Sequence, residues 1–309
     1  MLSVQNLSVT FTMYDVGLTQ KRLTVITDLD LEVGAGEVVA VVGSSGSGKS
    51  LLAHAILGIL PYNALVTGKI NFKGELLTSE RQSKLRGKEI ALIPQSVSYL
   101  DPLMRVGSQV HRAARLSGLS ATQARGVVNQ TFERYALPLP VKQLYPFQLS
   151  GGMARRVLVA TAAVGRAELL IADEPTPGLH IDVVVETLNH LRELANEGKA
   201  VILITHDLEA AVRVADKVAV FYAGTTLEVA AAEDFIDGNL RHPYTQALWR
   251  SLPQNGFIPV KGTQPSPEAL PDGCLFADRC PLVTDACQKA RPQFQIVRGA
   301  PVRCIHAEG

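Results

Sequence analysis

The sequence lacks the features of a membrane-spanning or secreted protein. No apolar run approaches the ~18 uninterrupted residues of a transmembrane helix, and the apolar stretches VAVFYA and AVILIT are short and bounded by charged or turn residues. The N-terminal MLSVQNLSVTF alternates like a strand and has no basic start, long apolar core or cleavage site of a signal peptide. We therefore expect the protein to stay in the cytoplasm and to reach a membrane only through a partner.

The sequence also lacks an excess of charge of either sign. Thirty Lys and Arg residues oppose twenty-nine Asp and Glu residues, which gives a net charge of +1. This balance argues against a nucleic-acid-binding protein that relies on a broad basic surface. The apolar fraction of 47% is ample for a buried core.

Cysteine is absent from the first 273 residues. All four cysteines lie in the C-terminal part of the chain: Cys274, Cys280, Cys287 and Cys304. In a reducing compartment such a local group favours metal or cluster ligation over disulfides.

Strands and helices alternate along most of the chain, which predicts an α/β fold with a mainly parallel sheet. EVVAVVG, LLIAD and AVILI read as buried strands, and DVVVETLNHLRELANEG reads as an amphipathic helix that ends at Gly198. KVAVFYAGTTLEVA reads as a hairpin around Gly224. Residues 1–37 read as alternating strands and residues 100–165 as mostly helical, whereas residues 256–273 read as an extended connection.

The stretch GSSGSGKS matches the phosphate-loop pattern G-x-x-x-x-G-K-[ST] in full. A strand precedes it and a helix follows it, as that motif requires, so a chance match is improbable. Lys49 is expected near the β- and γ-phosphates of a nucleotide, and the Ser50 hydroxyl is expected to ligate Mg²⁺. The predicted nucleotide-binding residues are Gly43, Ser44, Ser45, Gly46, Ser47, Gly48, Lys49 and Ser50.

Polar side chains follow three further predicted strands. Asp173 suits a Mg²⁺-binding role and Glu174 is expected to polarise an attacking water. Gln95 and His206 also end strands, and ligands bind at the carboxyl edge of open α/β sheets. We expect these residues to meet at that edge.

A second anion site is predicted at LSGGMARR, residues 149–156. Ser150 is a good helix cap, and a helix N-terminus favours anions. The phosphate loop lies about a hundred residues earlier, so this second site needs a phosphate of its own.

These motifs, in this order, resemble those of the ATP-binding subunits of ABC transporters: Walker A at 43–50, the Q-loop at Gln95, the signature at 149–153, Walker B at 169–174 and the switch His206. The resemblance implies a P-loop ATPase core with an N-terminal antiparallel β subdomain and a helical signature subdomain at about 97–165. It also implies that Gln95 joins Ser50 and Asp173 at Mg²⁺, and that Glu174, His206 and Gln95 are the catalytic residues.

The resemblance further implies head-to-tail pairing with another ATPase subunit. Ser150, Gly151 and Gly152 are then expected to face the γ-phosphate of ATP held by that subunit. Arg155 and Arg156 are expected to be structural or surface charges on the signature helix. Phe11 is expected to stack on adenine, with Tyr14 as the alternative and an ordinary core or surface role also open.

The C-terminal part resembles the extension of dipeptide, oligopeptide and nickel importers, through RHPYTQALWRSLP (241–253), PDGCLFADRCP (271–281) and PVRC (301–304). The predicted domains are therefore an ABC ATPase domain at 1–238 and an extension at 239–309. Members of this branch with the spacing C-x5-C-x6-C-x16-C can hold a 4Fe-4S cluster on four cysteinates. Thiolates also suit Zn²⁺, which stays as the alternative.

The resemblance implies an ATPase that energises an importer of dipeptides, oligopeptides, nickel or metal chelates. Its implied partners are a second, non-identical ATPase subunit, since the signature reads LSGGM, two membrane-spanning permease subunits and, indirectly, an extracytoplasmic substrate-binding protein. No nucleic acid is expected. The implied location is peripheral, on the cytoplasmic face of the bacterial inner membrane.

One departure supports an alternative function. His180 stands in TPGLH where the family usually has an Asp at the end of the D-loop. The alternative is a mainly regulatory or structural nucleotide-binding subunit whose partner performs most of the hydrolysis. A soluble ABC protein of translation or DNA repair is disfavoured, because the chain has one Walker A motif and no heptad run.

Overall fold

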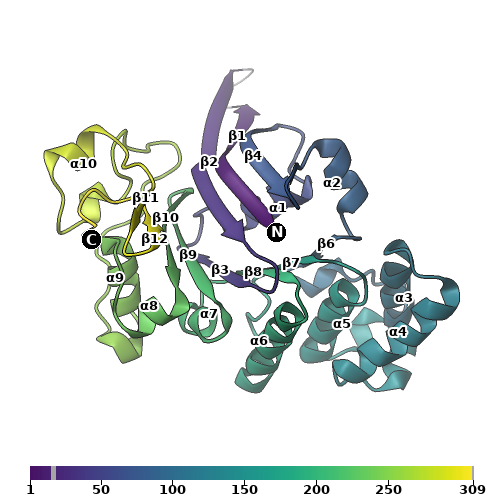
Figure 1. Cartoon of the computed structure of the whole chain (residues 1–309). Helices are drawn as coiled ribbons and strands as arrows, with labels where there is room; N and C mark the ends of the chain where they lie inside the picture. Colours follow the sequence, from purple (N-terminus) through teal and green to yellow (C-terminus); the bar gives the residue numbers. More distant parts are fainter. Residues whose placement is uncertain (15–18, 308–309) are drawn as a thin grey trace. The chain divides into compact units, whose positions relative to one another are not determined.

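The computed structural model describes residues 1–14 and 19–307, and the chain divides into two units (Figure 1). Unit 1 comprises Met1, Val33–Val38 and Thr78–Ile204. Unit 2 comprises Leu2–Glu32, Val39–Leu77 and Thr205–Gly309. The domain boundaries expected from the sequence, at 97, 165 and 239, remain predictions.

Unit 2 begins with an antiparallel sheet in the strand order β2-β1-β4-β5. Its strands are β1 (Leu2–Tyr14), β2 (Gln20–Val33), β4 (Ala64–Phe72) and β5 (Glu75–Leu76). On β1 the apolar residues Leu2, Val4, Leu7 and Val9 are buried. Alternate side chains of a strand share one face, and the register shift between Gln5 and Ser8 restarts this alternation at Leu7. The alternating strands expected in this region are confirmed.

Unit 2 also contains the strand that leads into the phosphate loop. β3 (Val38–Gly43) is buried throughout and pairs in parallel with β9 (Lys217–Tyr222). β9 pairs antiparallel with β10 (Thr225–Ala231) through a turn at Ala223 and Gly224, both with positive φ, as tight hairpins require. The predicted hairpin is confirmed. The helices α1 (Lys49–Leu57) and α7 (Leu208–Val214) belong to the same unit.

The C-terminal part of unit 2 is more ordered than its sequence suggests. It contains α8 (Ala232–Ile236), α9 (Pro243–Arg250), α10 (Asp285–Lys289) and the hairpin strands β11 (Gln295–Val297) and β12 (Ala300–Val302). β12 pairs with β10 through Glu228 and Val302. Apart from the 3-10 turn at Pro253–Asn255, residues 251–273 form no helix or strand, which agrees with the extended connection predicted for 256–273.

A buried arginine fastens this C-terminal part to β10. The Arg241 side chain is 2% exposed and lies 2.8 Å from Asp234 Oδ2 and 3.6 Å from Glu228 Oε1, measured from its Nη1. Its Nε and Nη2 atoms each donate at 2.8 Å to the carbonyls of Val297 and Arg298. One guanidinium therefore compensates buried acids and also holds the turn of the β11–β12 hairpin.

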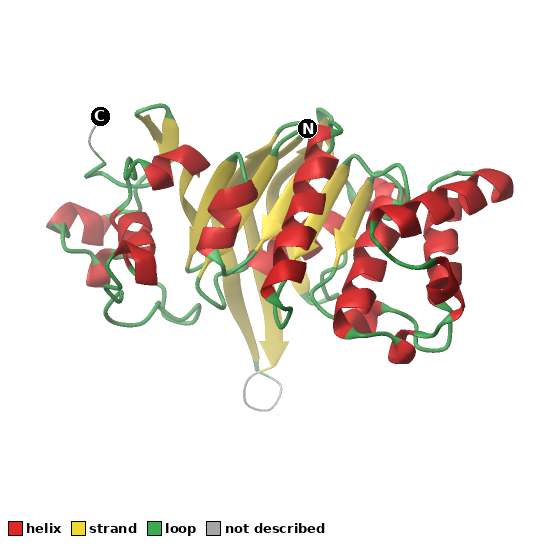
Figure 2. Ribbon diagram, turned by 90° about the horizontal axis from the view of Figure 1, so that it is seen from below, coloured by secondary structure: helices red, strands yellow, loops and turns green. Residues whose placement is uncertain are grey.

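Unit 1 is built on three parallel strands, β6 (Ile90–Ile93), β7 (Leu169–Asp173) and β8 (Ala200–Ile204). β7 and β8 are buried over their whole length, as apolar β-branched runs predict. The helix α5 (Gly151–Ala163) packs on β6, and α6 (Ile181–Asn196) packs on β8 (Figure 2). This arrangement places α5, which begins with the signature, beside β6, which leads to Gln95.

The remaining helices of unit 1 are α2 (Ser79–Leu85), α3 (Val106–Leu116) and α4 (Ala121–Arg134). The Ser120 and Gln123 side chains form a reciprocal capping box at the start of α4. Short 3-10 turns follow at Leu139–Gln143 and Pro146–Gln148, where the prolines interrupt the helices. Within residues 1–14 and 19–307, no helix combines the length and apolar character needed to span a membrane.

The Arg241 contacts predict a large stability effect. Arg241→Met keeps much of the side-chain volume but leaves the fully buried Glu228 without its cation. We expect the free energy of unfolding to fall by about 3–5 kcal/mol, the usual cost of breaking a buried ion pair from one side. Denaturant titration measures the free energy of unfolding. Arg213→Met is the control, because Arg213 pairs with Glu209 on the surface. Loss of that exposed pair should lower the free energy of unfolding by less than about 1 kcal/mol. Equal losses in the two variants would contradict this interpretation.

Candidate functional site

The phosphate loop connects β3 to α1 in unit 2, and two of its glycines are required by close packing. A Cβ atom at Gly43 would lie 2.2 Å from the carbonyl oxygen of Phe221 on β9. A Cβ atom at Gly48, which has a φ of +92°, would lie 2.9 Å from Ile26 Cγ1. Neither position accepts another residue without movement of its neighbours, so the loop backbone is held against the sheet.

The ammonium group of Lys49 holds the two ends of this loop together. Lys49 is 8% exposed, and its Nζ donates to the carbonyls of Gly43 at 2.9 Å and Ser44 at 3.1 Å. The Ser44 hydroxyl donates to Gln264 Oε1, and the Ser47 backbone N–H donates to the Ser44 carbonyl at 3.2 Å. The loop therefore presents a positioned cation next to the first turn of α1, where Ser50 lies and where a helix N-terminus favours anions.

The two aromatic candidates for adenine stacking lie near the end of β1. Phe11 is half-buried and faces Ala64 across the pair of β1 and β4. Tyr14 is exposed and lines a surface hollow of about 440 Å³ together with Tyr62 and Asn63. Of the two, Tyr14 has the more accessible ring, and the adenine-binding role of either residue remains a prediction.

The acidic pair of unit 1 ends β7. Asp173 and Glu174 are both buried, and the Glu174 backbone N–H donates to the Ile204 carbonyl at 2.9 Å. Glu174 has a φ of +46°, which is uncommon for a residue with a side chain. Such strained conformations persist where the surroundings impose them, and they cluster at functional sites.

Gln95 follows β6 and is exposed, and its backbone is held by the signature helix α5. Arg155 on α5 donates from Nη1 to the Pro94 carbonyl at 2.8 Å and from Nη2 to the Gln95 carbonyl at 2.6 Å. Arg155 is buried, and burial lowers the pKa of its guanidinium. Arg156 pairs with Glu186 at 2.7 Å. The structural role predicted for both arginines is confirmed, but the link from Arg155 to the Q-loop was not foreseen.

The signature begins α5 as predicted. The Ser150 hydroxyl accepts a hydrogen bond from the Met153 backbone N–H at 3.3 Å. Gly151 is exposed, and a Cβ atom there would meet nothing within 4 Å. At Gly152 a Cβ atom would only reach Val183, at 3.9 Å. The described residues of this chain therefore do not require glycine at Gly151 or Gly152.

Two histidines follow the acidic pair along the chain. His206 comes after β8, belongs to unit 2 and is exposed, and the next residue, Asp207, caps α7 by accepting from the Ala210 N–H at 2.9 Å. His180 precedes α6 in unit 1, is exposed and has its Nδ1 3.2 Å from Asp182 Oδ2. The predicted residues are thus divided, with the phosphate loop and His206 in unit 2, and Gln95, Asp173, Glu174 and the signature in unit 1.

The four cysteines are free thiols in unit 2. Cys274, Cys287 and Cys304 are buried and Cys280 is half-buried. Burial, and after it the charges of the other three thiols, raise the pKa of Cys274 to about 11. Cys287 Sγ lies 3.3 Å from His306 Nε2. In the part of the chain that the structure describes, no three Cys, His, Asp or Glu side chains are arranged to hold a metal ion.

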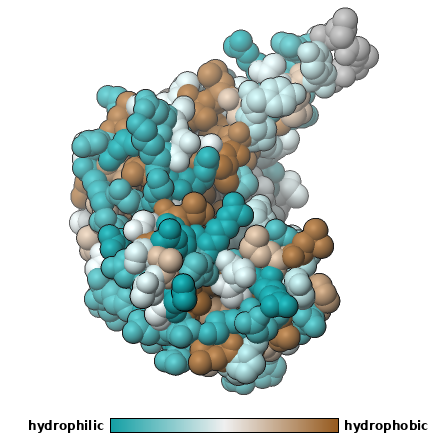
Figure 3. All heavy atoms as spheres, turned by 90° about the vertical axis from the view of Figure 1, so that its right-hand side faces the viewer, coloured by the Kyte–Doolittle hydropathy of each residue, from teal (hydrophilic) through white to brown (hydrophobic). Residues whose placement is uncertain are grey.

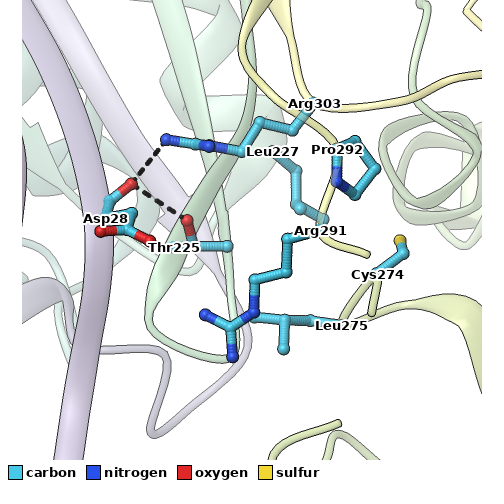
Figure 4. A pocket seen from close by; sticks show the side chains of 8 residues that line it. All are labelled: Asp28, Thr225, Leu227, Cys274, Leu275, Arg291, Pro292 and Arg303. Atoms are coloured by element: carbon cyan, nitrogen blue, oxygen red, sulfur yellow. Dashed lines mark hydrogen bonds between the residues drawn. The ribbon is translucent and has the colours of Figure 1, made fainter. Parts of the chain in front are cut away.

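Two arginines line the same small cavity as Cys274. Figure 4 shows Cys274 at a small cavity with Arg291 and Arg303 in its lining. Arg303 donates to the Asp28 carbonyl at 2.7 Å and pairs with Asp30 at 2.6 Å. The cavity measures about 20 Å³, which is room for one water molecule, so it is no binding site for a nucleotide or a peptide.

Two protein-family models match the chain. The model described as "ABC transporter" matches residues 26–177. The model described as "Oligopeptide/dipeptide transporter, C-terminal region" matches residues 227–287.

Curated relatives match over nearly the whole chain. The oligopeptide transport ATP-binding protein OppD of Escherichia coli (strain K12) is 35% identical, over 99% of this chain and 93% of that protein. The dipeptide transport ATP-binding protein DppD of Bacillus subtilis (strain 168) is 38% identical, over 94% of this chain and 90% of that protein.

Among solved structures, a dimeric post-hydrolysis state of the ATP-binding cassette MJ0796, bound to ADP and Pi, has a TM-score of 0.65 at 25% identity. That match covers 75% of this chain and 99% of the cassette.

The contacts of Arg155 predict that it orders the Q-loop. In Arg155→Lys the single ammonium cannot reproduce the two-pronged contact with the Pro94 and Gln95 carbonyls. We expect backbone amides of residues 95–99 to exchange their hydrogens about tenfold faster, the equivalent of one lost charge-assisted hydrogen bond. Hydrogen-exchange mass spectrometry measures this, with the neighbouring Arg156→Lys as the matched control. Equal protection of the segment in both variants would show that Arg155 does not order it.

Proposed function

The chain belongs to the ATP-binding proteins of the ABC transporter family, in the oligopeptide/dipeptide branch, and from that membership we propose that it hydrolyses ATP to energise the import of peptides. The observation that carries this proposal is the phosphate loop, in which the buried Lys49 is already oriented by two loop carbonyls. Relatives named for oligopeptide and dipeptide transport support peptides as cargo ahead of nickel or metal chelates.

The loop residues 43–50 bind the phosphates of ATP in this proposal. Backbone N–H groups of the loop and of the first turn of α1 accept the anion, and Lys49 neutralises part of its charge. An aromatic ring at the end of β1, Phe11 or Tyr14, covers the adenine.

Ser50, Gln95 and Asp173 offer a hydroxyl, an amide and a carboxylate oxygen, which are the hard donors that Mg²⁺ prefers. The ion, when bound with ATP, neutralises phosphate charge. Glu174 is the general base that orients and deprotonates the attacking water. His206 completes the catalytic set by contacting the phosphate that is released.

The signature serves an ATP molecule held by a second ATPase subunit. Three observations support this: Ser150 caps α5, the N-terminus of α5 favours an anion, and a Cβ atom at Gly151 would meet open space. We infer a non-identical partner because the signature reads LSGGM.

Membrane-spanning permease subunits dock on the helical part of unit 1 in this proposal, which places the chain on the cytoplasmic face of the membrane. Exposed apolar side chains in this part support the assignment, among them Tyr99, Leu103 at 88% exposure and Phe147. Figure 3 views the side on which α3 and α4 lie, where hydrophobic side chains interrupt a largely hydrophilic surface. Peptide reaches the permeases from an extracytoplasmic binding protein.

The regulatory alternative is supported by His180, which faces solvent beside Asp182 at the start of α6. In that case the chain binds ATP but its partner performs most of the hydrolysis.

Glu174→Gln separates the two functions. The amide keeps the shape of the side chain but cannot accept the proton of water, so hydrolysis by the assembled transporter should fall about 10²- to 10⁴-fold while ATP binding persists. Phosphate release measures hydrolysis, and nucleotide titration measures ATP binding. Glu197→Gln, at a residue that pairs with Arg134 on the surface, should hydrolyse normally. Normal hydrolysis by Glu174→Gln as well would favour the regulatory alternative.

The cysteines are proposed to hold a 4Fe-4S cluster, with Zn²⁺ as the alternative. Support comes from their spacing and from the four free thiols, whose electrostatic interactions contribute, after burial, to the raised pKa of Cys274. The role proposed for the metal is structural.

Metal analysis of the purified chain tests this assignment. We expect a brown protein with about four irons per chain, the content of a cluster with four cysteinate ligands. Cys280→Ser should lose metal and destabilise residues 270–309, whereas Lys49→Ala should keep its metal content. One zinc per chain without colour would select the alternative, and the absence of both metals would exclude both assignments.

A further inference from the structure

The C-terminal extension contacts the phosphate loop at Ser44. The Ser44 hydroxyl donates a hydrogen bond to Gln264 Oε1. Burial raises the pKa of Tyr244, whereas interactions of its hydroxyl with the side chain and the backbone of the same serine lower it. Gln264 and Tyr244 lie 220 and 200 residues after Ser44, and all three belong to unit 2.

Ser44 is also an acceptor for the loop lysine. Its carbonyl accepts from Lys49 Nζ at 3.1 Å and from the Ser47 N–H at 3.2 Å. Whatever fixes Ser44 therefore also fixes one of the carbonyl contacts that orient the Lys49 ammonium. The extension is therefore linked to the Lys49 ammonium through Ser44.

The two extension residues are themselves held firmly. Gln264 ends a segment, residues 257–264, that we call the strap. Arg279 donates to the strap carbonyls of Lys261 at 2.7 Å and Val260 at 3.1 Å, and to the Tyr222 hydroxyl at 3.0 Å. The strap is therefore tied to β9, the strand that packs against Gly43.

Tyr244 is fixed by ring contacts. It lies on α9 and is buried, with ring centroids 4.5 Å from Tyr222 and 5.2 Å from Phe276. The Arg279 guanidinium lies over the rings of Tyr222 and Phe276, at 5.7 and 5.8 Å. Tyr244 is thus held by buried rings, and the strap that leads to Gln264 is held by Arg279.

We propose that the C-terminal extension positions the phosphate loop for ATP, with Gln264 and Tyr244 acting on Lys49 through Ser44. This inference rests on the proposed function, since it assumes that the loop binds ATP. A loop held in its binding conformation loses less conformational entropy when the phosphates bind, which raises affinity without a new contact to the ligand. Gln264 and Tyr244 are positioning residues, because they act through Ser44.

The test measures the affinity of the purified full-length chain for ATP with Mg²⁺ by calorimetric titration. Gln264→Ala removes the bond to the Ser44 hydroxyl, and Tyr244→Phe removes the phenol oxygen but keeps the ring. Each should weaken ATP binding about three- to tenfold, the equivalent of one hydrogen bond. Gln254→Ala is the matched control, since Gln254 also lies in the extension but bonds to Glu209 on α7, and it should bind ATP like the unmodified chain.

A double-mutant cycle excludes a general structural effect. In a Ser44→Ala background the strap has lost its hydroxyl partner, so adding Gln264→Ala should change affinity by less than about twofold. An undiminished loss in that background, or unchanged or tighter ATP binding by Gln264→Ala alone, would overturn the proposal. Thermal unfolding of each variant identifies any that misfold.

The same titration gives a different result if the chain does not bind ATP at the phosphate loop. The unmodified chain would then show no ATP binding that Lys49→Ala abolishes. Binding that depends on Lys49 but ignores Gln264 would leave ATP binding supported and exclude only the positioning role of the extension.

Discussion

The buried ammonium of Lys49, held by the carbonyls of Gly43 and Ser44, is the interaction on which the nucleotide site depends. A cation taken out of water needs such partners, because an unpaired buried charge is costly. The loop can supply both carbonyls only because Gly43 lets its backbone approach β9 closely. Phosphate recognition therefore rests on backbone packing between β3 and β9 as much as on the lysine itself.

The extension is attached to that same part of unit 2 by two arginines. Arg241 compensates Glu228 on β10 and holds the β11–β12 hairpin, and Arg279 ties the strap to Tyr222 on β9. A guanidinium can make all of these contacts, because its several N–H groups can donate to carbonyls and to a carboxylate or hydroxyl at the same time. A lysine at either position would satisfy fewer acceptors.

Several elements of both units could be predicted because local signals agree within them. β3 is a continuous apolar run that ends at a glycine, and α6 and the hairpin at Gly224 combine a hydrophobic pattern with a glycine at the helix end or the turn. Helix α9 and the β11–β12 hairpin carry short, weak patterns, and their order comes from contacts with β10 and with buried aromatic rings. Such long-range contacts leave no periodic trace in the chain.

The functional residues likewise divide into those that local sequence patterns reveal and those whose contacts only the structure shows. The motifs at 43–50 and 169–174 could be found by their spacing, whereas the bonds from Arg155 to the Q-loop and from Gln264 to Ser44 join residues 60 and 220 positions apart. A lone Arg or Gln carries no signal of its partner. The strained φ of Glu174 is likewise visible only in the structure, since no sequence pattern marks a non-glycine residue in that region.

The two glycine motifs look alike in sequence but differ in their physical cause. Gly43 is required by this chain, because a Cβ atom there would lie 2.2 Å from the Phe221 carbonyl. Gly151 has no such neighbour: a Cβ atom would meet open space, and its φ is not in the left-handed region. A glycine that neither packing nor backbone conformation demands costs helix stability relative to alanine, by roughly 1 kcal/mol within a helix. In the proposed function, the ATP of a partner subunit approaches α5 at this position, and that approach would account for a glycine there.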